Sequence, residues 1–235
     1  MAKKQTKKSE VEYELLENPE VLARRLDRGE DFVKKNSKIF GGILIAVVIL
    51  IAGILFFQIH RQNQNEKGQA EMFQAVYYFE QDQTDLALNG DGTSVGLLKI
   101  ADDYSGTDAA NLANFYIGSI YLSEGQFDKA ITHFKKFSAD DYFVQAKAYA
   151  LLGDAYLELG NTSEAISYYK KATTKSENKF FTPRYLNKLA VAYEEAGDMA
   201  NAIKTYETIE EKYFESYEYT NARKHKARLE GLASK

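Results

Sequence analysis

The sequence contains one run of 19 consecutive residues without a polar side chain, at positions 39–57 (IFGGILIAVVILIAGILFF). Extended by Gln58 and Ile59 and coiled as an α-helix, this run is about 30 Å long, the thickness of a bilayer's hydrocarbon core. Strands of this length are rare. A helix buried in a protein core is a further alternative, but nothing charged interrupts the run. We therefore predict a single transmembrane helix at residues 39–59.

A cleaved signal peptide is the closest alternative to a retained anchor. The apolar part of a signal peptide has about 7 to 15 residues and is followed by small residues at the cleavage site. Here 38 residues precede the run, and the bulky Phe56, Phe57, Gln58 and Ile59 stand at its end. We expect the anchor to stay attached.

Positive charge predicts the orientation of this helix. Residues 20–38 contain six Lys and Arg, whereas residues 60–79 contain two. Because basic flanks remain in the cytoplasm, we expect the N-terminus there and residues 60–235 on the exported side. In a bacterium these places are the inner membrane and the periplasm.

Residues 1–38 form the predicted cytosolic basic tail, with 10 Lys and Arg against 8 Asp and Glu. Asn18 as a cap and Pro19 at the first helical position indicate a short amphipathic helix from there to about Lys35. This helix would either dock on a cytosolic factor or lie on the lipid surface.

Three later segments, residues 117–134, 152–169 and 189–206, resemble one another. Their alignment places a Tyr, a Gly, an Ala and an aromatic residue in register, with successive offsets of 35 and 37 residues. Such a period indicates stacked units of two helices, in which the Gly ends the first helix and the Ala allows close helix approach. The residues in register are Tyr121, Tyr156 and Tyr193; Gly125, Gly160 and Gly197; Ala130, Ala165 and Ala202; and Phe134, Tyr169 and Tyr206.

This order of small and aromatic residues resembles the tetratricopeptide repeat. Gly118 and Gly153 are also in register with that pattern, and Ala190 replaces the Gly in the third copy. The resemblance implies an all-α solenoid of stacked helical hairpins, since an isolated hairpin cannot bury its apolar face.

We expect the repeat domain at residues 69–235, separated from the anchor by a linker at 60–68. Upstream of the clear copies, a helix at 69–82, a loop at 88–93 and a helix at 94–104 are interpreted as a degenerate first repeat. Downstream, residues 216–232 are predicted to form a C-terminal capping helix, with late basic residues on its outer side.

Composition and motifs exclude most kinds of chemistry. The absence of Cys excludes disulfides, thiol catalysis and Cys-ligated zinc, and the net charge of −4 argues against a nucleic-acid binder. The three His residues stand far apart, without the spacing of a known catalytic or metal motif. NGDG at 89–92 lacks the spaced carboxylates of a calcium loop and is interpreted as a turn. We therefore expect no cofactor, metal, small-molecule substrate or catalytic residue, and no enzymatic activity.

The family resemblance implies a concave groove, lined by the first helix of each hairpin, as the protein-binding surface. Mixed charges and apolar side chains there suit a peptide or protein ligand, although Phe115, Leu122 and Val191 would also fit between helices. The candidate groove residues are Phe115, Ser119, Leu122, Lys147, Asp154, Glu158, Arg184, Asn187, Lys188, Val191 and Glu195.

The whole layout of basic tail, single anchor and exported repeats resembles the YfgM family of bacterial inner-membrane proteins. That resemblance implies a non-enzymatic scaffold, an ancillary subunit of the SecYEG translocon that works with a PpiD-like membrane-anchored prolyl isomerase on exported chains. The alternative is an envelope regulator that links a cytosolic factor, bound by the N-terminal helix, to the exported repeats.

Overall fold

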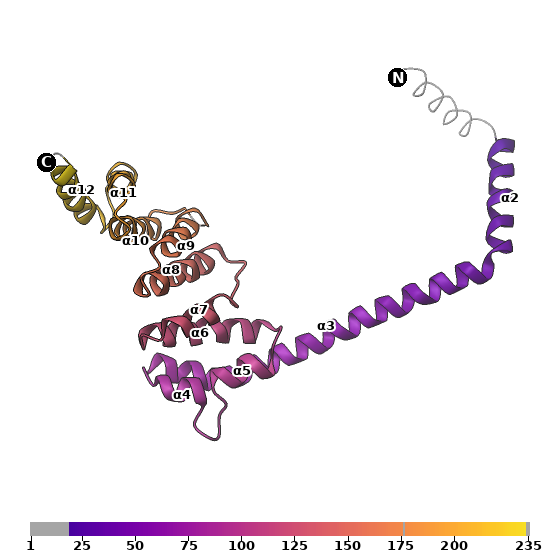
Figure 1. Cartoon of the computed structure of the whole chain (residues 1–235). Helices are drawn as coiled ribbons and strands as arrows, with labels where there is room; N and C mark the ends of the chain where they lie inside the picture. Colours follow the sequence, from indigo (N-terminus) through magenta and orange to yellow (C-terminus); the bar gives the residue numbers. More distant parts are fainter. Residues whose placement is uncertain (1–18, 176, 234–235) are drawn as a thin grey trace, which may run out of the picture. The chain divides into compact units, whose positions relative to one another are not determined.

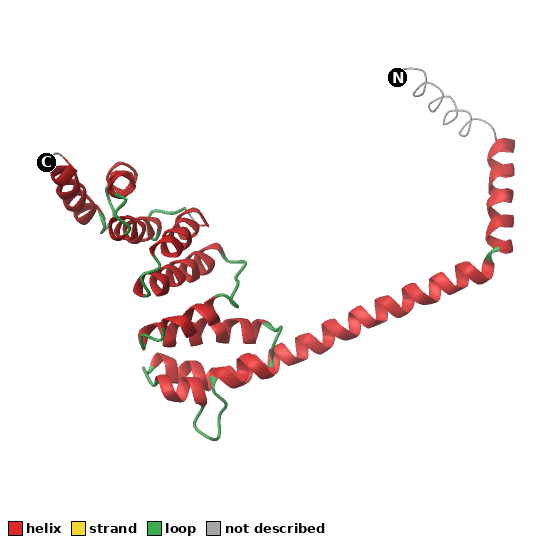
Figure 2. Ribbon diagram, viewed as in Figure 1, coloured by secondary structure: helices red, strands yellow, loops and turns green. Residues whose placement is uncertain are grey.

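The computed structural model describes residues 19–175 and 177–233, and every regular element within these ranges is an α-helix (Figures 1 and 2). The chain divides into two compact units, Met1–His60 and Arg61–Lys235. The all-α fold class predicted from the sequence is confirmed. The proposed cap at Asn18 and the basic residues before it lie outside the described ranges.

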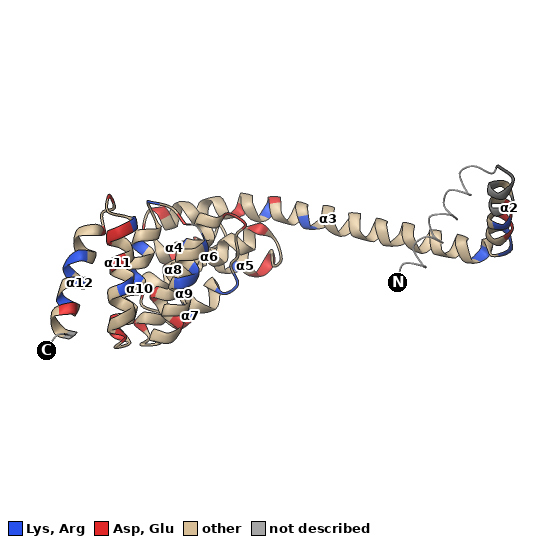
Figure 3. Ribbon diagram, turned by 90° about the horizontal axis from the view of Figure 1, so that it is seen from above, with Lys and Arg blue, Asp and Glu red and all other residues tan. Residues whose placement is uncertain are grey.

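The first unit contains helix α2 (Pro19–Lys35) and the start of helix α3 (Ser37–Glu80). α2 confirms the helix expected before the anchor. The apolar run lies within α3, is free of charge along its length (Figure 3), and has its side chains exposed all round. This part of α3 is long and apolar enough to cross a membrane.

Residues 60–68, which we expected to form a linker, are helical and continue α3 without a break. Nothing in their sequence breaks a helix, and small or polar residues on one face pack against the repeats. A Cβ on Gly68 would lie 2.8 Å from Ala109 Cβ. The Oδ1 atom of the buried Asn65 accepts a hydrogen bond from the Ala109 amide at 2.9 Å. The second unit accordingly begins at Arg61 rather than at residue 69.

The region interpreted as a degenerate first repeat differs in detail from the prediction. α3 ends at Glu80, and a short helix α4 (Thr84–Asn89) occupies the start of the expected loop before helix α5 (Leu97–Asp103). NGDG forms a turn, as predicted. Asp91 Oδ1 accepts hydrogen bonds from the amides of Thr93 at 2.8 Å and Ser94 at 2.6 Å, which hold the turn in place.

Three hairpins follow, and each turns at one of the predicted glycines. The φ values of these glycines are 72° at Gly125, 74° at Gly160 and 74° at Gly197. They lie in the left-handed region, which Gly adopts without steric cost because it has no Cβ. The amide that follows each of these glycines donates a hydrogen bond to the carbonyl of the repeated Tyr, a Schellman motif that satisfies the helix end. The hairpins are α6 (Asp108–Ser123) with α7 (Phe127–Phe134), α8 (Tyr142–Glu158) with α9 (Thr162–Lys175), and α10 (Thr182–Glu195) with α11 (Met199–Lys212).

The repeated small and aromatic residues form the core of these hairpins. Ala130, Ala165 and Ala202 are buried, as are the three aromatics that follow them by four positions. In the first two hairpins the aromatic residue of the second helix packs on the glycine of the first helix, and in the third Ala190 and Tyr206 share one core cluster. A Cβ on Gly118 would lie 2.8 Å from the Phe134 ring, and one on Gly153 would lie 2.5 Å from the Tyr169 ring.

Helix α12 (Tyr219–Ala233) covers the end of the array and confirms the predicted cap. Ala222 and Leu229 are buried against the third hairpin. Lys226 Nζ lies 2.7 Å from Glu210 Oε2, and Arg228 pairs with Glu194. These late basic residues therefore pair with acidic residues of α10 and α11.

Candidate protein-binding groove

Six of the eleven predicted groove residues line one open groove of about 530 Å³ across the first helices of the three hairpins. α6 contributes Leu122, α8 contributes Asp154 and Glu158, and α10 contributes three residues. α6 contacts α8, and the side chains of α8 and α10 meet at the ion pair between Asp154 and Lys188. The groove residues from the prediction are Leu122, Asp154, Glu158, Asn187, Lys188 and Val191.

A cross-repeat ion pair crosses the middle of this groove. Lys188 Nζ lies 2.7 Å from Asp154 Oδ1, and the same oxygen accepts a hydrogen bond from the Tyr169 hydroxyl at 2.7 Å. Burial of Tyr169, followed by the neighbouring Asp154 carboxylate, raises the pKa of Tyr169 far above its ordinary range, so the hydroxyl stays a donor. The floor of the groove is therefore polar and internally satisfied.

The rim of the groove offers both apolar and charged contact points. Leu122 and Val191 are half-buried, and Glu158 is exposed. Leu157 and Phe127 also line the groove, although they are not among the groove residues predicted from the sequence. Leu157 stands three residues after Asp154 and so shares its helix face, which is the signal that could have found it. An extended segment with apolar side chains and a positive charge suits such a surface.

Phe115, Ser119 and Lys147 lie apart from this groove. The Phe115 ring packs against Phe137, with ring centres 4.9 Å apart, and Lys147 Nζ lies 5.7 Å from the centre of the Phe115 ring. Ser119 donates its hydroxyl to the Phe115 carbonyl of its own helix at 2.9 Å. For Phe115, packing between helices is thus the better description.

Arg184 and Glu195 also lie outside the groove. Arg184 lines a different hollow with Lys179, Phe180 and Tyr217, and its Nε lies 3.9 Å from Glu218 Oε1. Glu195 is exposed near the end of α10. The basic side chains of α8 and α10 therefore do not converge into a clamp for a ligand's terminal carboxylate.

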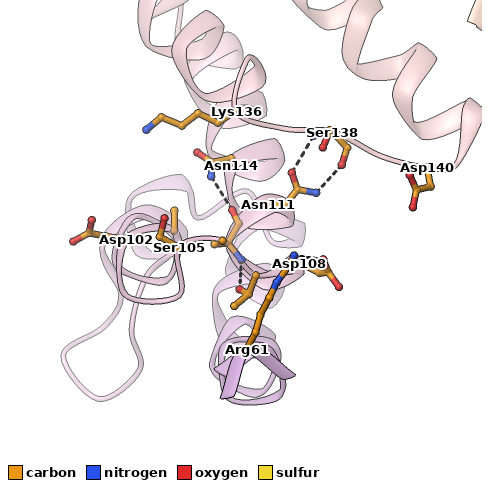
Figure 4. A pocket seen from close by; sticks show the side chains of 13 residues that line it. Arg61, Asp102, Ser105, Asp108, Asn111, Asn114, Lys136, Ser138 and Asp140 are labelled. Carbon is orange, nitrogen blue, oxygen red and sulfur yellow. Dashed lines mark hydrogen bonds and ion pairs between the residues drawn. The ribbon is translucent and has the colours of Figure 1, made fainter. Parts of the chain in front are cut away.

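A second hollow, of about 520 Å³, lies where α6 begins (Figure 4). Its lining is mostly polar: Asn111 exchanges two hydrogen bonds with the backbone of Ser138, at 2.7 and 2.9 Å, and Arg61 Nη2 lies 3.9 Å from Asp108 Oδ1. Among residues 19–175 and 177–233, no group of three or more His, Asp or Glu is placed to hold a metal ion.

Matches to family models agree with this architecture. Two family models, both described as tetratricopeptide repeat, match residues 108–178 and 151–213. Together these ranges cover helices α6 to α11, the three hairpins. The chain therefore carries tetratricopeptide repeats, which typically serve as non-enzymatic scaffolds for protein–protein interaction.

One solved structure that matches is described as "Crystal structure of MamA", with 25% sequence identity and a TM-score of 0.43. The match covers 50% of this chain and 65% of the MamA chain. The search of curated proteins found no match.

Proposed function

We propose that this protein is a membrane-anchored adaptor that holds a segment of another protein in the groove across α6, α8 and α10. Residues 39–59 would fix it in the bilayer, and the repeats would present the groove to partners at the membrane surface. Confinement near a membrane raises the effective concentration of a partner, so a groove of modest affinity is occupied.

The observation that carries this proposal is the composition of the groove itself. Apolar side chains from successive repeats, Leu122 and Val191 among them, border a floor whose polar groups are already paired. Such a surface gains free energy by covering its apolar atoms, at about 25 cal/mol per Å². It also leaves the exposed Glu158 carboxylate available for a basic residue of the ligand.

The finer proposal concerns compartment and partner. The excess of Lys and Arg before the anchor favours a cytoplasmic N-terminus and repeats on the exported side, the periplasm of a bacterium. The resemblance of the layout to the YfgM family favours the Sec translocon and a membrane-anchored prolyl isomerase or chaperone as partners. Exported polypeptides emerging beside that translocon would be the occupants of the groove.

A site-specific photocrosslinker tests the groove. Placed at Glu158 of the full chain in intact membranes, it should capture a protein; placed at Lys204, exposed on the second helix α11, it should capture much less. Val191→Asp should lower the capture at Glu158, because it puts a charge among the apolar contacts. Equal capture at both positions would contradict a role for the groove.

Purification of the full chain in mild detergent tests the finer proposal. Translocon subunits or a membrane-anchored isomerase should co-purify above the level seen with an unrelated single-span protein. Capture of other proteins alone would leave the adaptor role standing and remove the Sec assignment. Protease added outside spheroplasts should cut the repeats, and protection until lysis would contradict the proposed orientation.

A further inference from the structure

Four aromatic side chains cluster on the surface where α8 and α10 begin. Tyr142, Phe143, Phe180 and Phe181 are 63%, 51%, 73% and 44% exposed. The rings of Phe143 and Phe181 lie 6.1 Å apart at an interplanar angle of 63°, so the two pairs form one continuous patch. We call these four residues the aromatic edge.

Capping interactions hold the aromatic edge outward. Asp141 caps α8, its Oδ1 atom accepting a hydrogen bond from the Val144 amide at 2.9 Å, and so fixes the backbone of Tyr142 and Phe143. Asn178 Oδ1 accepts hydrogen bonds from the amides of Phe180 at 2.9 Å and Phe181 at 2.7 Å. Exposure of these rings is therefore a property of ordered helix starts.

Lysine side chains flank the rings. Lys175 Nζ lies 5.2 Å from the Tyr142 ring centre, and Lys179 Nζ lies 5.5 Å from that of Phe180. Asp140, Asp141 and Glu177 are also exposed nearby, so the charges roughly balance. Aromatic rings with lysines at their margin are typical of surfaces at the bilayer–water boundary, where the ring is buried and the ammonium group reaches water or headgroups.

A series of contacts connects the aromatic edge to the residue where the repeat unit begins. Arg61 lies beside Asp108 at the start of α6, and Asn111 on the next turn bonds to Ser138 (Figure 4). The chain then runs from Ser138 into Tyr142 and Phe143, and Phe143 contacts Phe181. All of these residues lie at the edge of the repeats where the first helices begin.

This edge is the one that the chain ties to the apolar segment. Arg61 follows Ile59, the last residue of that segment, by two positions, and the chain spans at most about 3.6 Å per residue. Whatever angle the repeats take, Arg61 and the start of α6 beside it stay close to the end of the apolar segment. The groove lies near the ends of α6 and α8 and at the middle of α10, away from the edge where these helices begin.

We propose that the aromatic edge inserts into the interfacial layer of the bilayer that holds the anchor, so that the repeats dock on lipid. This inference depends on the proposed membrane anchoring of residues 39–59. Docking orients the molecule, with the aromatic edge on the lipid and the groove turned toward the aqueous side. Because the nearby charges balance, it does not require anionic lipid.

The sequence contains no Trp, so single Trp substitutions make clean reporters. We would reconstitute full-length variants into phosphatidylcholine vesicles whose acyl chains are brominated near the headgroup, and measure the quenching of Trp fluorescence. Phe180→Trp reports on the aromatic edge. Leu159→Trp is the matched control. Leu159 is also exposed, but it follows the last residue of α8, about 25 Å along the helix from Tyr142 at its start. Phe57→Trp reports on the anchor.

The proposal expects Phe180→Trp and Phe57→Trp to lose most of their emission and Leu159→Trp to keep it. Quenching of Phe57→Trp without quenching of Phe180→Trp would overturn docking while leaving the anchor intact. No quenching of Phe57→Trp would overturn the anchoring itself. Equal quenching of Phe180→Trp and Leu159→Trp would overturn the assignment of this edge. Phe143→Trp, a second variant within the aromatic edge, should be quenched like Phe180→Trp, and its failure to be quenched would also overturn the proposal.

Discussion

Lys188 and Asp154 join the first helices of the second and third hairpins, with Nζ 2.7 Å from Oδ1. The same carboxylate oxygen accepts the hydrogen bond from Tyr169, which packs on Gly153 of its own hairpin. One side chain thus links the closure of a hairpin to the stacking of its neighbour. The groove floor and the core of the array depend on the same contacts.

Asp154→Ala should destabilise the repeats by about 1–3 kcal/mol, because it leaves the hydroxyl of the buried Tyr169 without its acceptor. Asp154→Asn is the matched control. Its amide oxygen still accepts the hydrogen bond from Tyr169, and only the ion pair with Lys188 is lost. Urea unfolding of the full chain in mild detergent, followed by helical circular dichroism, measures both. Equal losses in the two variants would contradict this account of Tyr169.

Gly153→Ala should cost about 1–3 kcal/mol of stability, because the new Cβ would lie 2.5 Å from the Tyr169 ring and would force α8 and α9 apart. Gly231→Ala in α12 is the control: a Cβ there meets nothing within 4 Å, and Ala favours the helix. The same unfolding measurement applies. A neutral Gly153→Ala would mean that Tyr169 readily moves aside.

Stability should fall as the pH drops through about 6.5, in part because of His133. Burial, followed by the nearby Lys136, lowers the pKa of His133, so the folded state prefers the neutral ring that bonds Asn114 Oδ1 at 2.8 Å. A base whose folded pKa lies below its unfolded value contributes fully above the unfolded pKa. That contribution is lost as the unfolded chain takes up a proton.

The measurement compares unfolding of the wild type and His133→Gln at several pH values between about 7.5 and 5. The Gln variant keeps an amide donor for Asn114 but has no proton to gain. The free energy of unfolding of the wild type should fall relative to that of His133→Gln as the pH falls, because only the wild-type chain gains a proton at this position on unfolding. An unchanged difference across this range would rule out His133 as the cause.

Asn65→Ala should loosen the attachment of α3 to the repeats. Asn65 Oδ1 is the acceptor for the buried amide of Ala109 in the first turn of α6, and its loss should cost about 1–2 kcal/mol. Faster amide exchange at Ala109 in the full chain would report this. Asn65→Asp, which retains an acceptor, should exchange more slowly than Asn65→Ala. Rapid exchange already in the wild type would favour a flexible linker over the continuous helix.

The hairpins could be predicted from sequence because their signals are local. A left-handed residue at Gly125, Gly160 and Gly197 ends the first helix, and a small residue five positions later allows the second to approach. Residues 60–68 were mispredicted because a polar stretch reads as a linker. Only the contacts of Asn65 and Gly68 with Ala109, 41 or more positions away, make it part of the domain.

The sequence by itself determined the apolar helix, the three helical hairpins and the cap, since each follows from hydrophobicity, period and turn chemistry within a short window. Only the tertiary structure decided which candidate residues share a groove. Lys147 and Lys188 both carry a cation on a first helix, yet one lies over Phe115 and the other pairs with Asp154. The partner of each lysine depends on how neighbouring hairpins stack. These partners lie more than 30 residues away in the sequence, so no local sequence pattern predicts the contact.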